Sequence, residues 1–391
     1  MAESWIEALP QGYQKRAVTC LEELIRRNSA NPPGRELETA EYAAKVLQEA
    51  GLQVQLDEFE PGRCNVTATL GEGDEADLVF LGHLDVVPAE GEWLHGKFEP
   101  QEENGRIYGR GACDMKGGIA AMITAATALA ASGKTLCGKI LLLLDSDEEN
   151  GNKGIHRLLS QGPIRAKSAI VGEPSDMKLL LGNKGYASVY VHTKGVSCHA
   201  SQPEHGKNAI YQMARAILRL EQYAEQISQK TAPHLGKATL SVGTIRGGTR
   251  INIVPDECVC EVERRVLPGE TRESVFQGIQ DLLDGVAEVT PRGTYTMPSL
   301  LETDHPFTKQ TAAMMTEVLG KEPESGAFTG GTEAAYLSQF GIPTLIVGPG
   351  SLEQAHGVDE YVSVQQLHQC TDLYYRLMQK ACVKPTASEE A

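Results

Sequence analysis

The stretch Asp77-Leu78-Val79-Phe80-Leu81-Gly82-His83-Leu84-Asp85 joins a continuous apolar run to two polar residues. Such a run is typical of a strand buried on both faces of an α/β sheet. Ligands of these sheets bind beyond the carboxyl ends of the strands, where His83 and Asp85 stand. Their i, i+2 spacing in extended backbone directs both side chains the same way. A neighbouring carboxylate fixes the tautomer of a metal-binding histidine, although a strand-end histidine bonded to an aspartate can also be purely structural.

The composition indicates a soluble protein of more than one domain. The chain has 391 residues, of which 41% are hydrophobic and 23% charged, and its net charge of −16 argues against a nucleic-acid partner. The first residues lack a basic segment followed by an apolar one, and no apolar run approaches the roughly 20 residues of a membrane span. The nine cysteines form no CxxC pair. We therefore expect free thiols, a cytoplasmic location and no membrane contact.

The spacing of apolar residues predicts α/β alternation at both ends of the chain and a different pattern between them. The first part is predicted to hold helices at 14–28, 36–50, 117–131 and 153–160, and strands at 52–58, 64–70, 78–83, 140–144 and 169–171. The middle part is predicted to hold strands at 186–193, 238–245 and 253–266, and helices at 206–228 and 271–285. The last part is predicted to hold helices at 306–319, 332–339 and 363–380, and a strand at 344–347.

The middle part has the order β-α-β-β-α-β, which is typical of a small α+β domain with one open face. An α/β domain interrupted by an insertion accounts for the whole pattern. The predicted parts are 1–183 for the first half of the α/β domain, 184–293 for the inserted domain and 294–391 for the second half.

Further acidic residues and a histidine follow other predicted strands. Glu148 and Glu149 come after the apolar strand ending at Leu144, in a stretch with four carboxylates in five residues, and Glu173 follows the strand 169–171. Taken singly, this stretch fits a solvated acidic loop. Four carboxylates beyond one buried strand repel one another, however, and a bound cation would relieve that repulsion.

Two more candidates lie in loops, Asp114 before Met115-Lys116-Gly117-Gly118 and His356 some ten residues beyond the strand 344–347. Asp114 by itself could simply cap the helix that follows. Together, the histidines and carboxylates suit Zn²⁺, with Co²⁺ or Mn²⁺ as substitutes. They suffice for two ions about 3.5–4 Å apart, which requires one bridging carboxylate and leaves one free as a base.

Motifs along essentially the whole chain resemble those of the M20 metallopeptidases, which include acetylornithine deacetylase, succinyl-diaminopimelate desuccinylase, aminoacylase and carboxypeptidases. The last two motifs are most similar to the acetylornithine deacetylase branch. In family order, the motifs are Gly82–Pro88, Tyr108–Gly118, Asp147–Gly151, Gly172–Pro174, Gly195–Ser201, Gly330–Glu333, and Gly348–Gly350 through Gln354–His356.

The resemblance implies a zinc-peptidase-like catalytic domain with a mixed central sheet, interrupted by an inserted ferredoxin-like α+β domain through which the protein dimerises. It also implies two Zn²⁺ per chain. His83 and Glu173 would bind one ion, Glu149 and His356 the other, and Asp114 would bridge them.

The same resemblance implies the remaining catalytic roles. Asp85 would orient His83, and Glu148 would be the general base for hydrolysis by metal-activated water. His199 of the inserted domain would stabilise the oxyanion, reaching the site from the partner subunit. A cis peptide bond is implied between Asp114 and Met115.

Substrate recognition is implied for residues that match family positions near a substrate carboxylate, namely Arg265, Asn252 and Thr332. Arg265 suits bidentate binding of a carboxylate, but it could equally be a solvated arginine at a strand end. Arg250 stands where relatives usually have a small residue, and Lys184 where some have arginine. Arg250 would favour an acidic acyl group if it points into the cleft.

The leading hypothesis is therefore a zinc amidohydrolase that removes an acetyl or succinyl group from an amino acid, working as a homodimer. A metallo-carboxypeptidase or dipeptidase of the same fold is the first alternative, because peptide and N-acyl amide bonds are chemically alike. A non-catalytic metal-binding relative is the second. Glu148 argues against that, because a structural site needs the ligands but no base.

Overall fold

The structure is a computed structural model that describes residues 5–293 and 295–384, and the chain divides into two compact units. The first comprises Met1–Gly182, Leu301–Gly326 and Thr332–Ala391, and the second Asn183–Leu300 and Ala327–Gly331. The second unit thus reaches beyond the predicted segment 184–293. Its added residues 327–331 are held by a bond from the Lys184 N–H to the Phe328 carbonyl at 3.3 Å. The expected bounds at 1, 294 and 391 lie outside the described residues.

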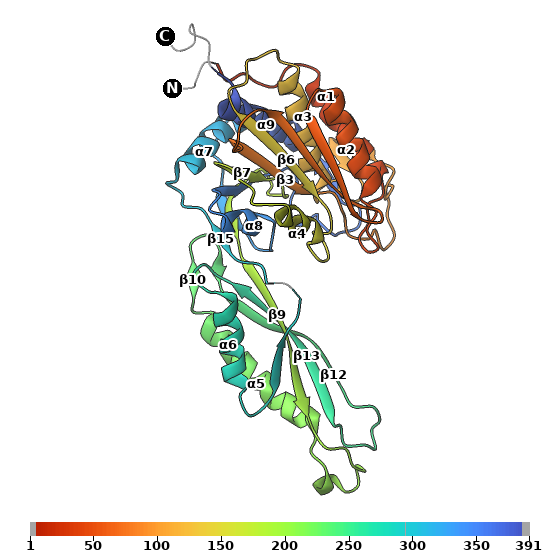
Figure 1. Cartoon of the computed structure of the whole chain (residues 1–391). Helices are drawn as coiled ribbons and strands as arrows, with labels where there is room; N and C mark the ends of the chain where they lie inside the picture. The colour runs from red at the N-terminus through yellow and green to blue at the C-terminus, as the bar shows by residue number, and fades with distance from the viewer. Residues whose placement is uncertain (1–4, 294, 385–391) are drawn as a thin grey trace. The chain divides into compact units, whose positions relative to one another are not determined.

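A mixed sheet forms the centre of the first unit, as predicted (Figure 1). Its central strand β3 is buried at every position and pairs in parallel with β6 and β7, and β7 pairs in parallel with β17. The outer pairs β1–β2, β2–β6 and β17–β8 are antiparallel. In spatial order the strands are β1 (Gln53–Glu60), β2 (Arg63–Gly71), β6 (Lys139–Asp145), β3 (Leu78–His83), β7 (Ala169–Val171), β17 (Thr344–Ile346) and β8 (Leu179–Asn183).

Helices cover both sides of this sheet (Figure 1). On one side lie α1 (Tyr13–Arg26), α2 (Leu37–Glu49), α3 (Lys116–Ala130) and α9 (Val364–Cys382), and on the other α4 (Lys153–Ser160) and α8 (Ala334–Gln339). A further helix, α7 (Pro306–Leu319), packs on α9. A Cβ added to Gly118 of α3 would lie 2.2 Å from the Gly172 carbonyl oxygen, so glycine is what allows α3 to approach the end of β7.

Several short strands were not predicted from the sequence. A three-stranded sheet has the order β18 (Tyr361–Ser363), β5 (Arg106–Tyr108) and β4 (Gln101–Glu103). Two more, β15 (Ser299–Leu300) and β16 (Ser325–Phe328), belong to the central sheet, where β15 follows β8 in the strand order and β16 pairs with β8. Strands of two to four residues are too short to create a detectable alternation of apolar and polar residues.

The second unit confirms the predicted β-α-β-β-α-β order. Its sheet is antiparallel with strands in the order β12-β13-β9-β14, the ferredoxin-like arrangement. The elements in chain order are β9 (Gly185–Lys194), the short helix η1 (Pro203–His205), α5 (Ala209–Ile227), the hairpin β10 (Thr231–Ala232) and β11 (Gly236–Lys237), β12 (Thr239–Gly247), β13 (Glu257–Val266), α6 (Arg272–Leu283) and β14 (Glu288–Pro291).

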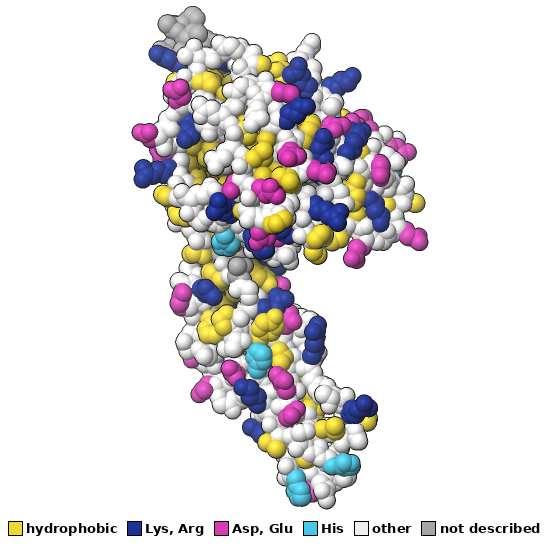
Figure 2. Space-filling model, turned by 45° about the vertical axis from the view of Figure 1, so that its right-hand side comes forward, with side chains coloured by type: hydrophobic (Ala, Val, Ile, Leu, Met, Phe, Trp, Pro, Cys, Tyr) yellow, Lys and Arg dark blue, Asp and Glu magenta, His cyan; other side chains and the backbone are white. Residues whose placement is uncertain are grey.

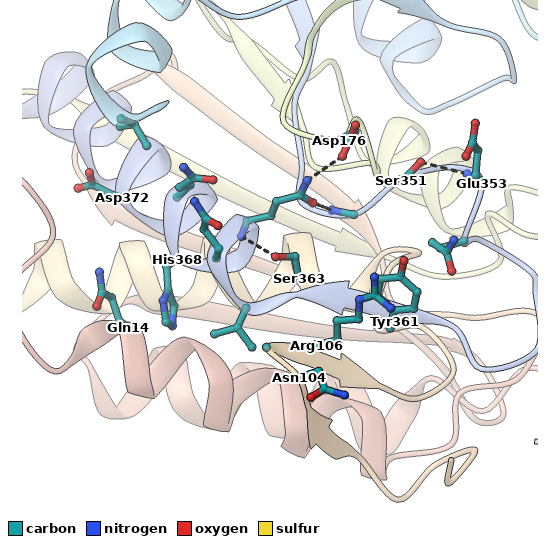
Figure 3. Close-up of a pocket in the computed structure, with 18 residues that line it drawn as sticks. Gln14, Asn104, Arg106, Asp176, Ser351, Glu353, Tyr361, Ser363, His368 and Asp372 are labelled. Atoms are coloured by element: carbon teal, nitrogen blue, oxygen red, sulfur yellow. Dashed lines mark hydrogen bonds between the residues drawn. The ribbon is translucent and has the colours of Figure 1, made fainter. Parts of the chain in front are cut away.

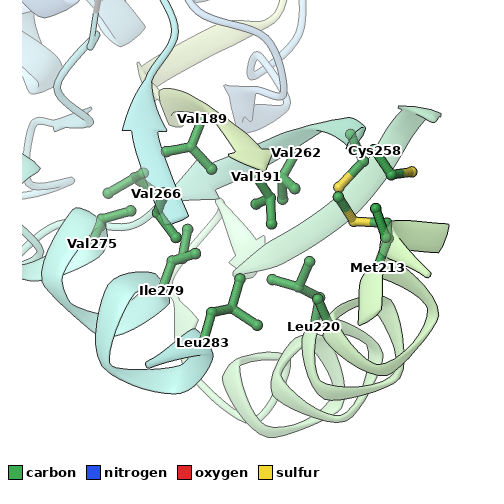
Figure 4. Close-up of a cluster of buried hydrophobic side chains, with 14 residues drawn as sticks. Val189, Val191, Met213, Leu220, Cys258, Val262, Val266, Val275, Ile279 and Leu283 are labelled. Atoms are coloured by element: carbon green, nitrogen blue, oxygen red, sulfur yellow. The ribbon is translucent and has the colours of Figure 1, made fainter. Parts of the chain in front are cut away.

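The core of this unit lies between its sheet and helices α5 and α6. Val191, Val262, Leu220 and Ile279 are among its buried members (Figure 4). Residues of β13 alternate between buried and half-buried positions, which is expected of a sheet with one packed and one open face.

Two predicted elements begin at least three residues later than expected. The strand predicted at 253–266 starts at Glu257, because Pro255 has no N–H to donate and Ile253 donates within a turn to the Arg250 carbonyl. The helix predicted at 206–228 starts at Ala209, because the Asn208 side chain caps it by accepting from the Tyr211 N–H.

Among the described residues, no helix combines the length and the apolar character needed to cross a membrane. All nine cysteines lie within the described part of the chain and are free thiols, as expected.

Leu220→Ala should destabilise the second unit by about 2–5 kcal/mol, because it opens a cavity at a fully buried position. Denaturant unfolding followed by circular dichroism measures the change. Glu221→Ala, at the exposed neighbouring position of the same helix, should alter stability by less than about 0.5 kcal/mol. Equal effects of the two variants would contradict the packing described for α5.

Candidate metal centre

The parallel strands bring three chain segments to one edge of the first unit's sheet. His83 is the last residue of β3 and lies opposite Asp145, the last residue of β6, while Leu81 lies opposite Val171, the last residue of β7. The loops that leave these strands therefore start side by side. They carry the predicted residues Glu148, Glu149 and Glu173.

Asp114 lies between the two histidines. Its Oδ1 is 3.1 Å from His83 Nε2, and its Oδ2 is 3.4 Å from His356 Nε2. The His356 Nε2 is also 3.0 Å from Glu149 Oε1, and the His83 Nε2 is 3.8 Å from Glu173 Oε1. Each oxygen of one carboxylate thus faces a different histidine, and each histidine has a glutamate of its own.

These donors fit divalent cations. Ligand atoms of His83, Asp114 and Glu149 lie within 4.8 Å of one another. Imidazole nitrogen and carboxylate oxygen are ligands that zinc accepts, and the divided carboxylate of Asp114 suits a bridge between two ions.

Protons balance part of the negative charge in this centre. Burial disfavours a charged His83, yet the Asp114 hydrogen bond and the nearby Glu173 charge hold the pKa of His83 well above its usual range. Hydrogen bonds to Asp114 and Glu149 raise the pKa of His356 to about 10. Without a bound cation, the surrounding carboxylates therefore favour the protonated form of both imidazoles.

Burial and neighbouring charges also shift the pKa values of the carboxylates in this centre. Burial, followed by the charge of Asp114, raises the pKa values of Glu173 and Glu149. Burial, followed by the charge of Glu333, raises the pKa of Glu148 well above its usual range. Asp114 behaves differently, because hydrogen bonds from both histidines outweigh its burial and lower its pKa.

Asp85 contacts the site differently from the expectation. Its main-chain oxygen lies 2.9 Å from His83 Nδ1, whereas its carboxylate Oδ1 is 3.7 Å away. The carboxylate accepts instead from the Glu148 N–H at 3.1 Å and the Glu149 N–H at 3.2 Å. Asp85 therefore orients the imidazole through its backbone and holds the Glu148–Glu149 loop through its side chain.

A buried network that the sequence did not reveal braces this loop. Asn31 donates to the Asp85 carboxylate at 2.8 Å and to the Asp147 carboxylate at 2.9 Å. Arg63 pairs with Asp147 and donates to Asn31 Oδ1. These residues are far apart in the chain, so no local motif could have identified them.

Two carboxyl groups near Glu148 had been given no role from the sequence. Glu333 and Asp145 are both fully buried, and a Glu333 oxygen lies within 4.8 Å of oxygens of Glu148 and Glu173. Burial raises the pKa of Asp145 to about 8 and that of Glu333 well above its usual range. In the sequence, Glu333 could have been considered because it directly follows Thr332, a predicted substrate-binding residue.

The peptide bond between Asp114 and Met115 is cis, as the family resemblance implied.

Comparisons with known proteins show the family of the chain. The model of peptidase family M20/M25/M40 matches residues 79–380. An acetylornithine deacetylase of Myxococcus xanthus is 31% identical over 357 residues, which cover 88% of this chain and 91% of the relative. The chain belongs to this M20 peptidase family. It is therefore a hydrolase of a metal-dependent family.

Solved structures share the fold of this M20 family member. An aminopeptidase of Bacillus cereus is 24% identical with a TM-score of 0.77, covering 94% of this chain and 98% of the other. A dinuclear metal-binding peptidase of the M20 family from Bacillus subtilis is 17% identical with a TM-score of 0.69, covering 95% and 100%.

Most of the residues of this M20 protein that were expected to contact the substrate or the oxyanion lie in the second unit. His199 is exposed, and its Nδ1 lies 2.7 Å from Ser201 Oγ. Arg250 and Asn252 are exposed on the segment before β13. Arg265 donates to Glu263 at 2.6 Å, and Lys184 donates to the Lys237 carbonyl at 2.8 Å.

Thr332, by contrast, is buried in the first unit, and its Oγ1 accepts from the Ala334 N–H at 3.1 Å, beside the start of α8.

A polar pocket of about 1010 Å³ lies elsewhere in the first unit of this M20 protein (Figure 3). Arg106, Asp176, Tyr361 and His368 are among its lining residues, which include none of the predicted metal ligands. Gln366 occupies part of it by bonding to Asp176 and to the Gly350 N–H. The pocket therefore has no part in the metal centre.

Zinc affinity of the metal-free protein should rise with pH between 6 and 8, by about tenfold per pH unit for each proton displaced. The sign follows because His83 and His356 have raised pKa values, and zinc binds only neutral imidazole. Calorimetric titrations in buffers of different ionisation enthalpy count the protons released. His356→Asn should flatten the pH dependence, and a flat profile for the unmodified protein would contradict the protonation described.

Proposed function

We propose that the protein is a dinuclear zinc amidohydrolase that removes an N-acyl group, acetyl or succinyl, from an amino acid. The observation that carries the proposal is the carboxylate of Asp114, whose two oxygens face His83 and His356 separately at 3.1 and 3.4 Å. The acetylornithine deacetylase of Myxococcus xanthus, at 31% identity, supports the substrate class.

Each ion would be held by a histidine, a glutamate and the shared Asp114. His83 with Glu173 would form one site, and His356 with Glu149 the other. When bound, the cations supply Lewis acidity, which lowers the pKa of water and polarises an amide carbonyl. Co²⁺ or Mn²⁺ could replace zinc, because these ions accept the same nitrogen and oxygen donors.

Glu148 is proposed as the general base. It belongs to the loop held by the Asp85 carboxylate, and it has no assigned role as a ligand. Its raised pKa suits a group that takes a proton from the attacking water and returns it to the leaving amine.

The second unit is proposed to supply the substrate contacts and the oxyanion donor. His199, which is exposed and bonded to Ser201, would donate to the oxyanion from the partner subunit. Arg265, Asn252 and Thr332 would bind the substrate carboxylate, and Arg250 and Lys184 would favour an acidic acyl group. Arg265 already pairs with Glu263 and lies over the Tyr186 ring, so it would have to exchange the glutamate for the substrate.

A homodimer through the second unit completes the proposal. Strand β12 is the edge of its sheet and is exposed along most of its length, which leaves backbone groups free to pair with a second copy. Exposed apolar side chains on and near this edge, Ile245 and Ile251 among them, also support a dimer interface here.

A small-molecule substrate fits the charge distribution better than nucleic acid does. The net charge is −16, and Lys and Arg side chains are interspersed with Asp and Glu on the face of the first unit in Figure 2. The nine free cysteines support a cytoplasmic location, where thiols stay reduced.

A substrate panel tests the proposal against its alternatives. The zinc-loaded protein is assayed for amine release from acetylornithine, succinyl-diaminopimelate, other N-acyl amino acids and dipeptides, and its metal content is measured. We expect two metals per chain and a kcat/KM for one N-acyl amino acid at least about tenfold above any dipeptide. Preference for dipeptides would favour the peptidase alternative, and no turnover with two metals bound would favour a non-catalytic protein.

Glu148→Gln should lower kcat by about 10²–10⁴-fold, because glutamine cannot carry the proton. The metal content should stay unchanged, since the proposed ligands are intact. Kinetics and elemental analysis of the same preparation measure both quantities. Glu72→Gln, at an exposed position after β2, serves as the control and should keep full activity. Undiminished turnover by Glu148→Gln would refute the role of Glu148.

A further inference from the structure

Glu360 is a buried carboxylate with four donors, and the proposed chemistry makes no use of it. It is 1% exposed. Its Oε1 accepts from the N–H groups of Cys113 and Asp114, both at 2.9 Å. Its Oε2 accepts from the Gly111 N–H at 3.0 Å and from the Arg110 guanidinium at 2.5 Å.

These bonds fix the backbone of the loop that carries the bridging carboxylate. Three N–H groups of the segment Gly111–Asp114 converge on one anion, the arrangement of an anion-binding nest. The donor nearest the metal centre is the backbone N–H of Asp114 itself. Glu360 is therefore linked to the Asp114 backbone by a direct hydrogen bond.

The same residue also belongs to the segment that carries the second histidine. Glu360 follows His356 by four residues, and its main-chain oxygen accepts from the Gly109 N–H at 2.9 Å. Directly after it, β18 pairs with β5 through Tyr361 and Tyr108. The two segments are thus joined at Glu360 by both side-chain and main-chain bonds.

Arg110 strengthens this junction. It is 2% exposed, pairs with Glu360 and lies over the Trp93 ring at 5.1 Å. Its Nη2 also lies 3.4 Å from the His356 main-chain oxygen. A buried ion pair persists when further hydrogen bonds satisfy its charges, and here those bonds go to the two segments that hold Asp114 and His356.

We propose that Glu360 is a positioning residue that sets the placement of Asp114 relative to His356, and thereby the affinity of the centre for the cation that both would hold. The inference rests on the proposed dinuclear site. Glu360 contacts neither the cation nor the substrate in this scheme, since its oxygens are occupied by Arg110 and the loop. It acts through Asp114, as residues behind metal ligands do.

Glu360→Gln tests the inference, because the amide keeps the size of the side chain but removes its charge and one acceptor. The zinc site of Asp114, His356 and Glu149 should lose about 10–100-fold in affinity, the range found for residues that orient metal ligands. Competition with a chromophoric chelator measures the zinc dissociation constants on protein whose folding is verified by circular dichroism. The visible spectrum of the Co²⁺-loaded protein, which reports ligand geometry, should change as well.

Glu270→Gln is the matched control. Glu270 also pairs with a buried arginine, Arg264, and accepts from the main-chain N–H of Leu267 at 3.1 Å, but it lies in the second unit. The Glu270→Gln variant should have a lower melting temperature but unchanged zinc dissociation constants and an unchanged Co²⁺ spectrum. A merely structural Glu360 would behave in the same way, so unchanged zinc affinity and spectrum in Glu360→Gln overturn the inference.

Glu360→Asp provides a second route if the glutamine variant does not fold. It keeps the charge but withdraws the carboxylate by one methylene from the N–H groups of Cys113 and Asp114. At least a fivefold loss of zinc affinity is expected, and an unchanged affinity overturns the inference. Failure of the unmodified protein to bind two zinc ions would instead refute the proposed function.

Discussion

Repulsion among carboxylates at one buried edge of a sheet is the constraint on which the rest of this structure depends. Three loops bring their acidic side chains to the carboxyl ends of β3, β6 and β7, because these strands are parallel and in register. Without a cation, raised pKa values at His83, His356 and Glu173 offset the charge with protons. A cation bound between the same groups would displace those protons, so metal binding and protonation compete for one site.

Most of the surrounding polar contacts hold this repelling set in place. The Asp85 carboxylate accepts from the N–H groups of Glu148 and Glu149, and Arg63 with Asn31 holds Asp147, directly before them. Glu360 does the same for the loop of Asp114. These buried polar residues therefore serve mainly to fix the backbone of the loops that carry the proposed ligands.

Whether a residue of the candidate site could be recognised from the sequence depended on its position relative to a predicted strand or a family motif. His83 and Glu173 could be predicted because each follows a recognisable buried strand, and the family motifs added Asp114 and His356. The sequence could not tell whether Asp85 contacts His83 through its main chain or its carboxylate, because that choice depends on distances of 2.9 and 3.7 Å. Glu360 was missed, because a single acidic residue in a loop looks the same whether it is solvated or buried.

The sequence by itself determined the longer helices and most of the longer strands, their alternation, the interruption by a β-α-β-β-α-β segment and the residue types able to bind cations. Apolar periodicity and strand-end motifs are local properties, so they can be recognised without a structure. Only the tertiary structure decided which oxygen of Asp114 faces which histidine, and that Glu360 joins residues 111–114 to the segment after His356. The contacts of Asp114 with His356 and of Glu360 with Cys113 link positions about 240 residues apart, and only the packing of the folded chain brings such positions together.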